Sequence, residues 1–369
     1  MPNRLSAAIP AAALLFVWLL GCIEPTATAE NPQAQSQQTP AGTQPAAAPG
    51  DAYSWIRGAT YNPSYARNCV QIWLDYDSEV IDRELGYAEK LRLNAVRIFL
   101  SVEAYEHDPE QFLARFENLL SLARKHKLVV QPVLFDSVGA APDLKSYRQQ
   151  DWLSSPAKQR VKNKAEWSKL ETYVKAVVTP HKNDERIVMW DIANEPVGFG
   201  REGSGPFTLD AYPDVVAFVN YFLDYTRSLG TTRPLTAGIR LARDVRHVAE
   251  KCDVLCYHAY FVPMENDIRH LRSRYSKPIH TNETVGYYAG GFQQVIPVLN
   301  SQKVGWFFWE LMFGSTQFTR GPKPMQGLIN RDGSCRNIKD VAAVMNVPPE
   351  QAAKIFKERP YSEKLDVAR

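Results

Sequence analysis

From Ala52 onward, hydrophobic residues recur along the chain in two alternating patterns. Short, nearly continuous apolar runs are typical of parallel strands buried on both faces. Between them, apolar residues repeat every three or four positions, as in amphipathic helices. The predicted strands are Trp55–Thr60, Ala95–Leu100, Leu128–Phe135, Ile187–Ala193, Pro234–Ile239, Val254–His258, Pro278–Asn282 and Val304–Trp309.

Helix signals lie between these runs. Asp108 followed by Pro109 predicts a capped helix start, because Asp can accept from exposed backbone N–H groups and Pro suits the first helical position. Helical spacing of apolar residues also predicts a helix within 80–91, before the second strand, and one within 167–177, before the fourth.

Eight strand–helix units in about 250 residues or more predict a single-domain (β/α)₈ TIM barrel over residues 52–346. A doubly wound sheet needs about six strands and usually a phosphate loop after the first strand. Here the first strand runs into Tyr61-Asn62-Pro63, which favours the barrel. Residues 347–369 are predicted to form a helical tail.

The N-terminus has the pattern of an export signal. Arg4 precedes an apolar stretch from Ala11 to Leu20 that is too short to span a bilayer. The stretch ends in Leu-Leu-Gly-Cys, which resembles the lipobox of bacterial lipoproteins and implies cleavage after residue 21 and lipidation of Cys22. A plain secretory signal with an incidental cysteine is the alternative. Ile23 in place of Asp favours the outer membrane, with the protein periplasmic or at the cell surface.

Composition narrows the picture further. Residues 22–51 are rich in Pro, Ala, Gln and Thr and predict a flexible tether. The whole chain is 45% hydrophobic and 22% charged with a net charge of +3, which excludes a disordered protein and argues against nucleic-acid binding. The only long apolar run is at the N-terminus, so a polytopic membrane protein is excluded, and we expect a monomer held to a membrane by its lipid.

Two glutamates follow predicted strands. Asn194-Glu195-Pro196 ends the fourth strand, and Glu283 follows the seventh, so both belong to the barrel end where chemistry occurs in this fold. Glycoside cleavage requires one carboxylic acid to protonate the leaving oxygen and one carboxylate to attack or stabilise the anomeric carbon. Glu310, near the eighth strand, is an alternative to Glu283.

With these residues in these positions, the chain resembles glycoside hydrolase clan A, and most of all family 5, over about residues 55–335. The resemblance implies a retaining β-glycoside hydrolase acting on a β-linked glucan, mannan or related glycan, without cofactor or metal. Glu195 would be the acid/base and Glu283 the nucleophile. The residues implied to bind the substrate are Arg97, Asn194, His258, Tyr260 and Trp309, with Arg97 favouring the charged form of Glu283.

Some features depart from this pattern or stay open. The histidine common after the third strand in the family is replaced by Phe135-Asp136-Ser137. Gly198, Gly200 and Gly203 spell a dinucleotide-binding motif, but no apolar helix follows at once, so we interpret them as a loop beside Glu195. Residues that can serve either as sugar platforms or as ordinary packing are Tyr61, Trp73 and Trp152.

The remaining alternatives concern cross-linking and function. Cys69 and Cys335 follow the first and eighth strands, which are neighbours in a closed barrel, and can form a disulfide in an exported protein. The rival to an enzyme is a lipoprotein that captures carbohydrate without cleaving it. A structural envelope protein would leave the paired glutamates unexplained.

Overall fold

The computed structural model describes residues 51–260, 263–285, 291–319 and 326–359, and the eight predicted strands are all present in them. The strands are β1 (Arg57–Thr60), β2 (Ala95–Phe99), β3 (Val129–Asp136), β4 (Trp190–Asn194), β5 (Leu235–Gly238), β6 (Leu255–Ala259), β7 (Ile279–Thr284) and β8 (Gly305–Phe308). Each lies within one to three residues of its predicted bounds.

The strands form one parallel sheet in the order β5-β4-β3-β2-β1-β8-β7-β6. A parallel bridge between Ile239 and Tyr257 joins the two ends of this order. The His258 N–H donates to the Ile239 carbonyl at 2.9 Å in the same place. The sheet therefore closes on itself, and the predicted single TIM barrel is confirmed.

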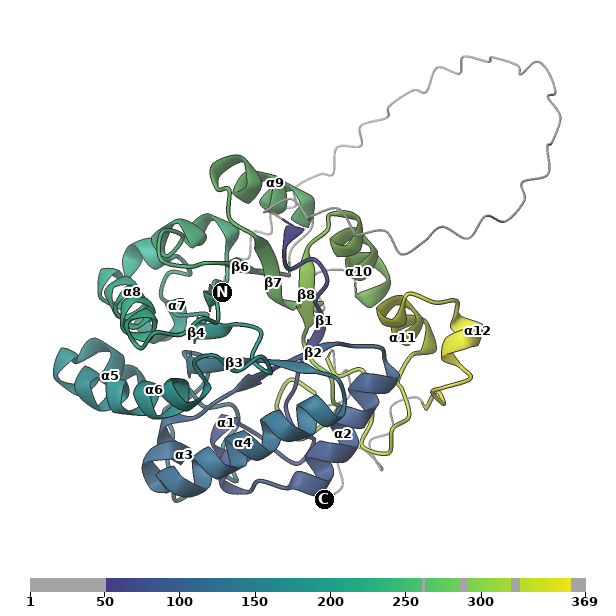
Figure 1. Ribbon diagram of the computed structural model, residues 1–369, viewed down its shortest axis with the longest axis horizontal. Helices are drawn as coiled ribbons and strands as arrows, with labels where there is room; N and C mark the ends of the chain where they lie inside the picture. Colours follow the sequence, from purple (N-terminus) through teal and green to yellow (C-terminus); the bar gives the residue numbers. More distant parts are fainter. Residues whose placement is uncertain (1–50, 261–262, 286–290, 320–325, 360–369) are drawn as a thin grey trace, which may run out of the picture. The chain divides into compact units, whose positions relative to one another are not determined.

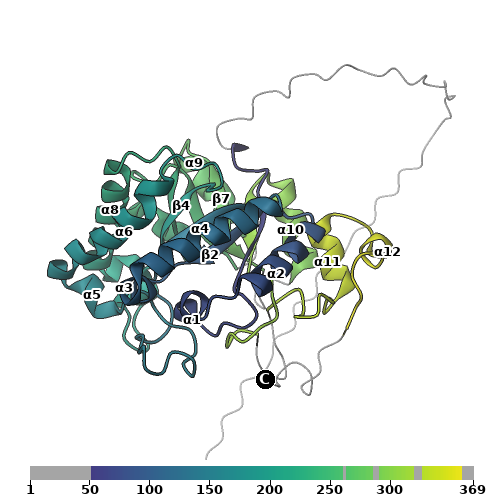
Figure 2. The ribbon, with the colours of Figure 1, turned by 60° about the horizontal axis from the view of Figure 1, so that its bottom comes forward.

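Helices surround the strands (Figure 1). Those up to β4 are α1 (Cys69–Leu74), α2 (Ser78–Lys90), α3 (Val102–His107), α4 (Pro109–Lys125), α5 (Lys158–Lys162) and α6 (Trp167–His181). They are followed by α7 (Val197–Gly200), α8 (Pro213–Ser228), α9 (Met264–Arg274), α10 (Phe292–Ser301), α11 (Ile338–Met345) and α12 (Pro349–Ala352). In Figure 2, α2 and α4 lie side by side outside β2. The start of α4 is as predicted, because the Asp108 carboxylate accepts from the Gln111 N–H at 3.0 Å.

One connection departs from the strand–helix repeat. Residues 239–254, between β5 and β6, are all described and contain no α-helix, only a 3₁₀ helix, η4 (Ala242–His247). The buried carboxylate of Asp244 in this helix accepts from the Thr208 hydroxyl at 3.0 Å and from the Leu209 N–H at 3.1 Å. The segment is thus tied to the loop after β4 at the catalytic end of the barrel.

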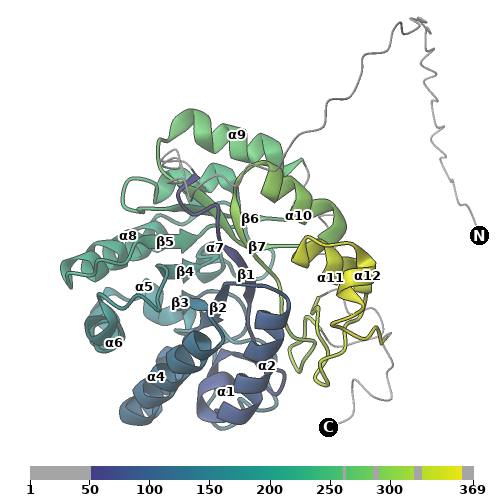
Figure 3. The same ribbon diagram turned by 45° about the vertical axis from the view of Figure 1, so that its right-hand side comes forward.

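The ends of the described chain lie against the barrel. Asp51 pairs with Arg272 at 3.4 Å and with Lys303 at 3.5 Å, and both partners precede strands, so Asp51 lies at the N-terminal end of the barrel. At the other end of the sequence, α11 packs on α10 and α12 on α11 (Figure 3). The predicted signal peptide, Cys22 and most of the tether lie outside the described residues. Within the described ranges, no helix is both long and apolar enough to cross a bilayer.

The Cys69–Cys335 disulfide that the sequence allowed is not formed in the structure. Cys69 and Cys335 are both buried free thiols. The Cys69 Sγ donates to the Leu153 carbonyl at 3.3 Å, whereas Cys335 exchanges backbone hydrogen bonds with the segment at Lys357 and Arg359. The two cysteines therefore serve separate packing environments.

The interior of the barrel changes from apolar to polar along the strands. Near the strand N-termini, a buried cluster includes Ile56, Ala95, Met189, Val254 and Phe307. Further along, fully buried Arg97, Asp191 and Asn282 point inward instead. Burying a charged group is costly unless the group is paired. Arg97, Asp191 and Asn282 must therefore find their hydrogen-bonding partners inside the barrel, and these partners include residues of the site at the strand C-termini.

Candidate active site

Glu195 occupies a strained backbone position at the end of β4. Its φ is +39°, in the left-handed backbone region that residues other than glycine rarely adopt. Its N–H donates to the Gly238 carbonyl at 2.8 Å, and its own carbonyl accepts from the Gly198 N–H at 2.9 Å and from the Ser137 hydroxyl. Strain of this kind persists only where the surroundings over-determine the conformation, and here three hydrogen bonds do so.

The glycines after Glu195 serve close packing. A Cβ on Gly198 would lie 2.8 Å from the Ser137 carbonyl oxygen, and one on Gly200 would overlap the ring of Tyr212. Both belong to the short helix α7 that turns away from the strand. Gly198 and Gly200 therefore let the Glu195 turn pack closely against the end of β3 and against Tyr212, and they lie in a short helix instead of the predicted loop.

Glu283, at the end of β7, is buried and ionised. Arg97 donates from Nη1 to its Oε1 at 2.8 Å, and the Tyr260 hydroxyl donates to its Oε2 at 3.0 Å. Burial alone would raise the pKa of Glu283, but the neighbouring His258 and Arg97 charges and the Tyr260 hydrogen bond lower it to about 2. The Glu283 carboxylate is thus an anion at the C-terminal end of the barrel.

Arg97 is the centre of the buried polar layer. Its Nε and Nη2 donate to Asp191 Oδ2 at 3.1 and 2.9 Å, and Nη2 also donates to Asn194 Oδ1 at 2.7 Å. Asp191 further accepts from Asn282 Nδ2 at 2.6 Å and from the Gly238 N–H at 3.0 Å. Sequence reasoning missed Asp191, although a carboxylate inside an apolar strand is a signal that it must face a buried cation.

His258 joins the two glutamates. Its Nδ1 lies 2.7 Å from Glu195 Oε1 and 3.2 Å from Glu283 Oε2. Burial would lower its pKa, but the two carboxylates raise it to about 9, so the ring is protonated at neutral pH. One ligand atom from each of the three residues lies within 4.8 Å of the other two, a spacing that a cation could use. Arg97 and the imidazolium already supply positive charge to these two carboxylates, however, so the arrangement suits acid–base chemistry better.

Asp136 ends β3, in the stretch where the resemblance implied a histidine. Its Oδ1 accepts from Asn194 Nδ2 at 2.9 Å and its Oδ2 from Trp152 Nε1 at 2.6 Å. Burial raises the pKa of Asp136 to about 7, even though these hydrogen bonds oppose the shift. Asp136 and Arg97 together fix both ends of the Asn194 amide, which leaves one N–H of Asn194 for a ligand.

The aromatic candidates divide between the site and the core. Trp309 follows β8 with 6% of its surface exposed, and its ring contacts Phe99, Trp152 and Phe318. Trp152 is 2% exposed and holds Asp136, and Tyr61 and Trp73 are fully buried. None of these last three offers a face for a sugar, so the reading of them as platforms is wrong.

Glu310 lies deeper than Glu283. It is fully buried, Asn62 Nδ2 donates to it at 2.5 Å, and the Thr316 hydroxyl donates to it at 3.0 Å. Burial raises its pKa to about 8, against the effect of these two donors. A carboxyl that is neutral at pH 7 is poorly suited to act as the nucleophile, which favours Glu283.

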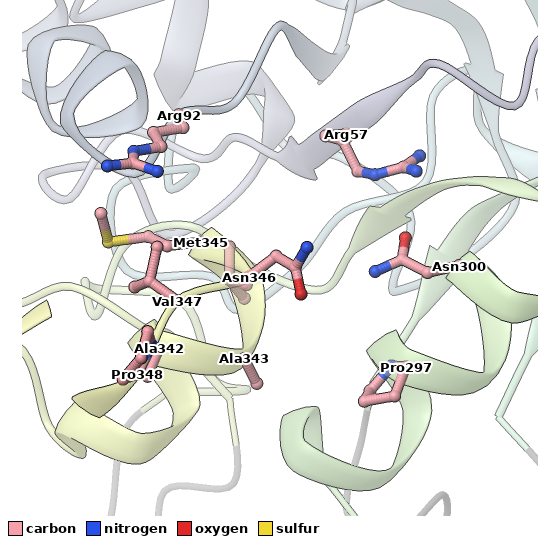
Figure 4. Close-up of a pocket in the computed structure, with 11 residues that line it drawn as sticks. Arg57, Arg92, Pro297, Asn300, Ala342, Ala343, Met345, Asn346, Val347 and Pro348 are labelled. Carbon is pink, nitrogen blue, oxygen red and sulfur yellow. The ribbon is translucent and has the colours of Figure 1, made fainter. Parts of the chain in front are cut away.

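A cavity of about 660 Å³ lies at the other end of the barrel, between α10 and α11 and beneath the start of β1 (Figure 4). Arg57, Arg92 and Asn300, which all precede or begin strands, line it together with the end of α11. It is therefore separate from the paired glutamates, which lie at the strand C-termini.

The sequence matches no protein-family model and no curated protein. Solved structures share its fold. An exo-β-1,4-mannosidase from Opitutaceae bacterium strain TAV5 aligns with a TM-score of 0.60 and 17% identity, over 81% of this chain and 60% of its own. The chain thus spans little more than half of that enzyme. A GH5_18 protein from Streptomyces cattleya, in complex with Manβ1-4GlcNAc, aligns with a TM-score of 0.58 and 17% identity, over 83% and 82%.

The endo-1,4-β-mannanase of Rhizomucor miehei aligns with a TM-score of 0.54 and 14% identity, over 80% of this chain and 98% of its own. A mannosidase described as glycoside hydrolase family 5, also from Rhizomucor miehei, aligns with a TM-score of 0.53. The fold is therefore that of the family 5 glycoside hydrolases, as the resemblance implied. At these identities the likeness concerns the fold, and function has to be argued from the site.

Proposed function

We propose that the protein is a retaining β-glycoside hydrolase with Glu195 as acid/base and Glu283 as nucleophile. The observation that carries the proposal is the pair of carboxylates joined by His258, with oxygen atoms within 4.8 Å of each other. Retaining enzymes hold their carboxyl groups about 5–5.5 Å apart, whereas inverting enzymes leave about 6.5–9.5 Å for a water molecule. An oxygen pair within 4.8 Å is compatible with the shorter separation, and we therefore favour direct attack by one carboxylate.

In the first step, Glu283 attacks the anomeric carbon as the glycosidic C–O bond breaks, and the departing oxygen takes the proton of Glu195. In the second step, Glu195 removes a proton from water, the oxygen of that water bonds to the anomeric carbon, and the bond to Glu283 breaks. Arg97 and Tyr260 keep Glu283 ionised between turnovers. Asn194, oriented by Arg97 and Asp136, is placed to hold the sugar 2-hydroxyl.

The substrate class in this proposal is a β-linked glucan, mannan or related glycan, bound with its reacting sugar against Trp309. Support comes from the solved neighbours, several of which are described as mannosidases or mannanases. A purely carbohydrate-binding protein would need neither a buried Arg97 to ionise Glu283 nor a histidine shared by both glutamates.

The test compares Glu195→Ala and Glu283→Ala on aryl β-glycosides with poor and good leaving groups. Loss of the acid should slow a phenyl glycoside by about 10²–10⁴ and a dinitrophenyl glycoside far less, because that leaving group needs little protonation. Loss of the nucleophile should slow both. Azide should then give a β-glycosyl azide with Glu195→Ala and an α-azide with Glu283→Ala. Swapped azide products would reverse the roles, and binding of glycans without any turnover by the wild type would favour the capture protein.

We also propose that the protein is exported and anchored through a lipid on Cys22, in the outer membrane. The lipobox-like sequence and the Pro- and Ala-rich segment after it support this proposal. Cys22→Ser should abolish incorporation of labelled fatty acid and release the protein from membrane fractions. Membrane retention of that variant, together with an unlabelled wild type, would contradict it.

A further inference from the structure

Arg240 lies beside the acid/base residue with its donors unused. It follows β5, and its Nη1 is 3.6 Å from Glu195 Oε2. The side chain is 34% exposed, and within the described part of the chain its guanidinium meets no hydrogen-bond acceptor at bonding distance. Since a guanidinium carries five N–H donors in a planar fork, most of the hydrogen-bonding capacity of Arg240 remains available to a ligand beside Glu195.

An exposed aromatic ring fixes the position of Arg240. The guanidinium carbons of Arg240 and Arg201 lie 4.4 and 3.3 Å from the ring centroid of Phe207, which is 42% exposed. The residues on either side of Phe207 are held in place. Tyr212 donates to the carbonyl of Pro206 at 3.1 Å, and the Thr208 hydroxyl donates to Asp244. Cation–π contacts of this kind order a guanidinium without neutralising its charge.

Positive charge is in excess around this ring. Lys158 and Lys162 of α5 lie close to Arg201, and the pKa of Lys158 is lowered by burial and by the charges of Arg201 and Lys162. Glu202 pairs with Lys162 at 3.2 Å but is 88% exposed, so solvent screens much of its charge. The four basic groups near Phe207 outnumber the two carboxylates that pair with them, Glu195 and Glu202, and such an excess of positive charge attracts anions.

The geometry also says which part of a substrate would meet Arg240. Glu195 turns Oε1 toward His258, which contacts Glu283, and turns Oε2 toward Arg240. In the proposed reaction the reacting sugar lies against Glu283, so a group bound by Arg240 beside Oε2 of Glu195 would belong to the leaving-group side of the substrate.

We propose that the leaving-group side of the site formed by Glu195 and Glu283 recognises an acidic sugar, with Arg240 pairing to its carboxylate. This inference rests on the proposed hydrolase function and names the substrate class of the same site. A carboxylate matches the planar fork of arginine in a bidentate pair, which a neutral sugar cannot form. The carboxylate would occupy the donors that now have no partner and would compensate the cations around Phe207.

The test uses 4-carboxyphenyl and 4-carbamoylphenyl β-glycosides of the sugar on which the wild type is most active. The two leaving groups have similar size, and the carbamoyl phenol is the slightly better leaving group, so leaving ability works against the expected preference. We expect the wild type to favour the carboxylate in kcat/KM by about tenfold, as one charge-assisted hydrogen-bonded pair would provide. Added salt should reduce the preference.

In Arg240→Gln the ratio of the two kcat/KM values should fall toward one, whatever happens to the absolute rates. The matched control is Arg243→Gln, an exposed arginine of η4 whose loss changes the net charge equally, and it should keep the wild-type ratio. A wild-type ratio near one, or a ratio that survives Arg240→Gln, would overturn the inference. An equal preference for a 4-sulfophenyl glycoside would overturn the carboxylate assignment. Failure to cleave any glycoside would instead refute the hydrolase itself.

Discussion

The strained turn at Glu195 gives a prediction that separates positioning from chemistry. Ser137→Ala removes the hydroxyl that donates to the Glu195 carbonyl and leaves the hydrogen bonds to Gly238 and from Gly198 in place. A hydrogen bond contributes a net of about 0.5–1.5 kcal/mol. If that free energy is lost from the correct placement of the acid, the rate should fall about 2- to 12-fold.

The fall should depend on the leaving group. A phenyl glycoside needs the proton of Glu195 and should show the whole loss in kcat/KM. A dinitrophenyl glycoside needs little protonation and should change by less than about twofold. Steady-state kinetics on the two substrates, with urea unfolding alongside, measure both effects.

Ser154→Ala is the matched control. Ser154 is equally buried, and its hydroxyl also donates to a backbone carbonyl, that of Ala140, at 3.2 Å. It should lose stability to a similar extent and keep the wild-type dependence on leaving group. Equal losses on both substrates in Ser137→Ala, or the same kinetic pattern in Ser154→Ala, would refute the idea that the Ser137 hydroxyl acts through the Glu195 backbone.

Three further outcomes are expected. The pKa of His258 is raised to about 9 from 6.5, because the two neighbouring carboxylates outweigh burial. The stability that the charged His258 contributes is therefore complete below pH 6.5 and is lost as the pH rises through 9. Urea unfolding at a series of pH values should show this alkaline loss in the wild type and not in His258→Gln. Arg97→Met leaves Asp191 and Glu283 buried without their cation and should cost about 3–5 kcal/mol in the free energy of unfolding, whereas a loss under about 1 kcal/mol would contradict the pairing. Glu310→Gln should change kcat/KM less than about threefold, because the carboxyl it replaces is already neutral at pH 7; a collapse as deep as that of Glu283→Gln would make Glu310 the nucleophile.

The sequence predicted the framework because its signals are local. Apolar runs mark the strands, and Asp108-Pro109 marks a helix start, through contacts within a few residues. Glu195 and Glu283 were predictable because each follows such a run, and strand ends of a barrel meet at one mouth. The family resemblance then supplied Arg97 and Tyr260, which the structure places in contact with Glu283.

The sequence did not predict contacts that depend on the three-dimensional arrangement. Nothing local shows that Asp136 would orient Asn194, or that Arg240 would come within 3.6 Å of Glu195. Tyr61 and Trp73 read equally well as platforms or as core, since burial is decided by which helix covers them. The missing helix between β5 and β6 was unexpected because the strand repeat implied a regular partner for every strand.

Asp51 marks the end of the barrel at which the described part of the chain begins. Its ion pairs with Arg272 and Lys303 fix it at the N-terminal end of the barrel, whereas the paired glutamates open at the C-terminal end. Whatever precedes this residue therefore joins the barrel at the end opposite the paired glutamates. A lipid joined through a flexible segment at that point would leave the mouth of the barrel uncovered by the residue to which the segment is attached.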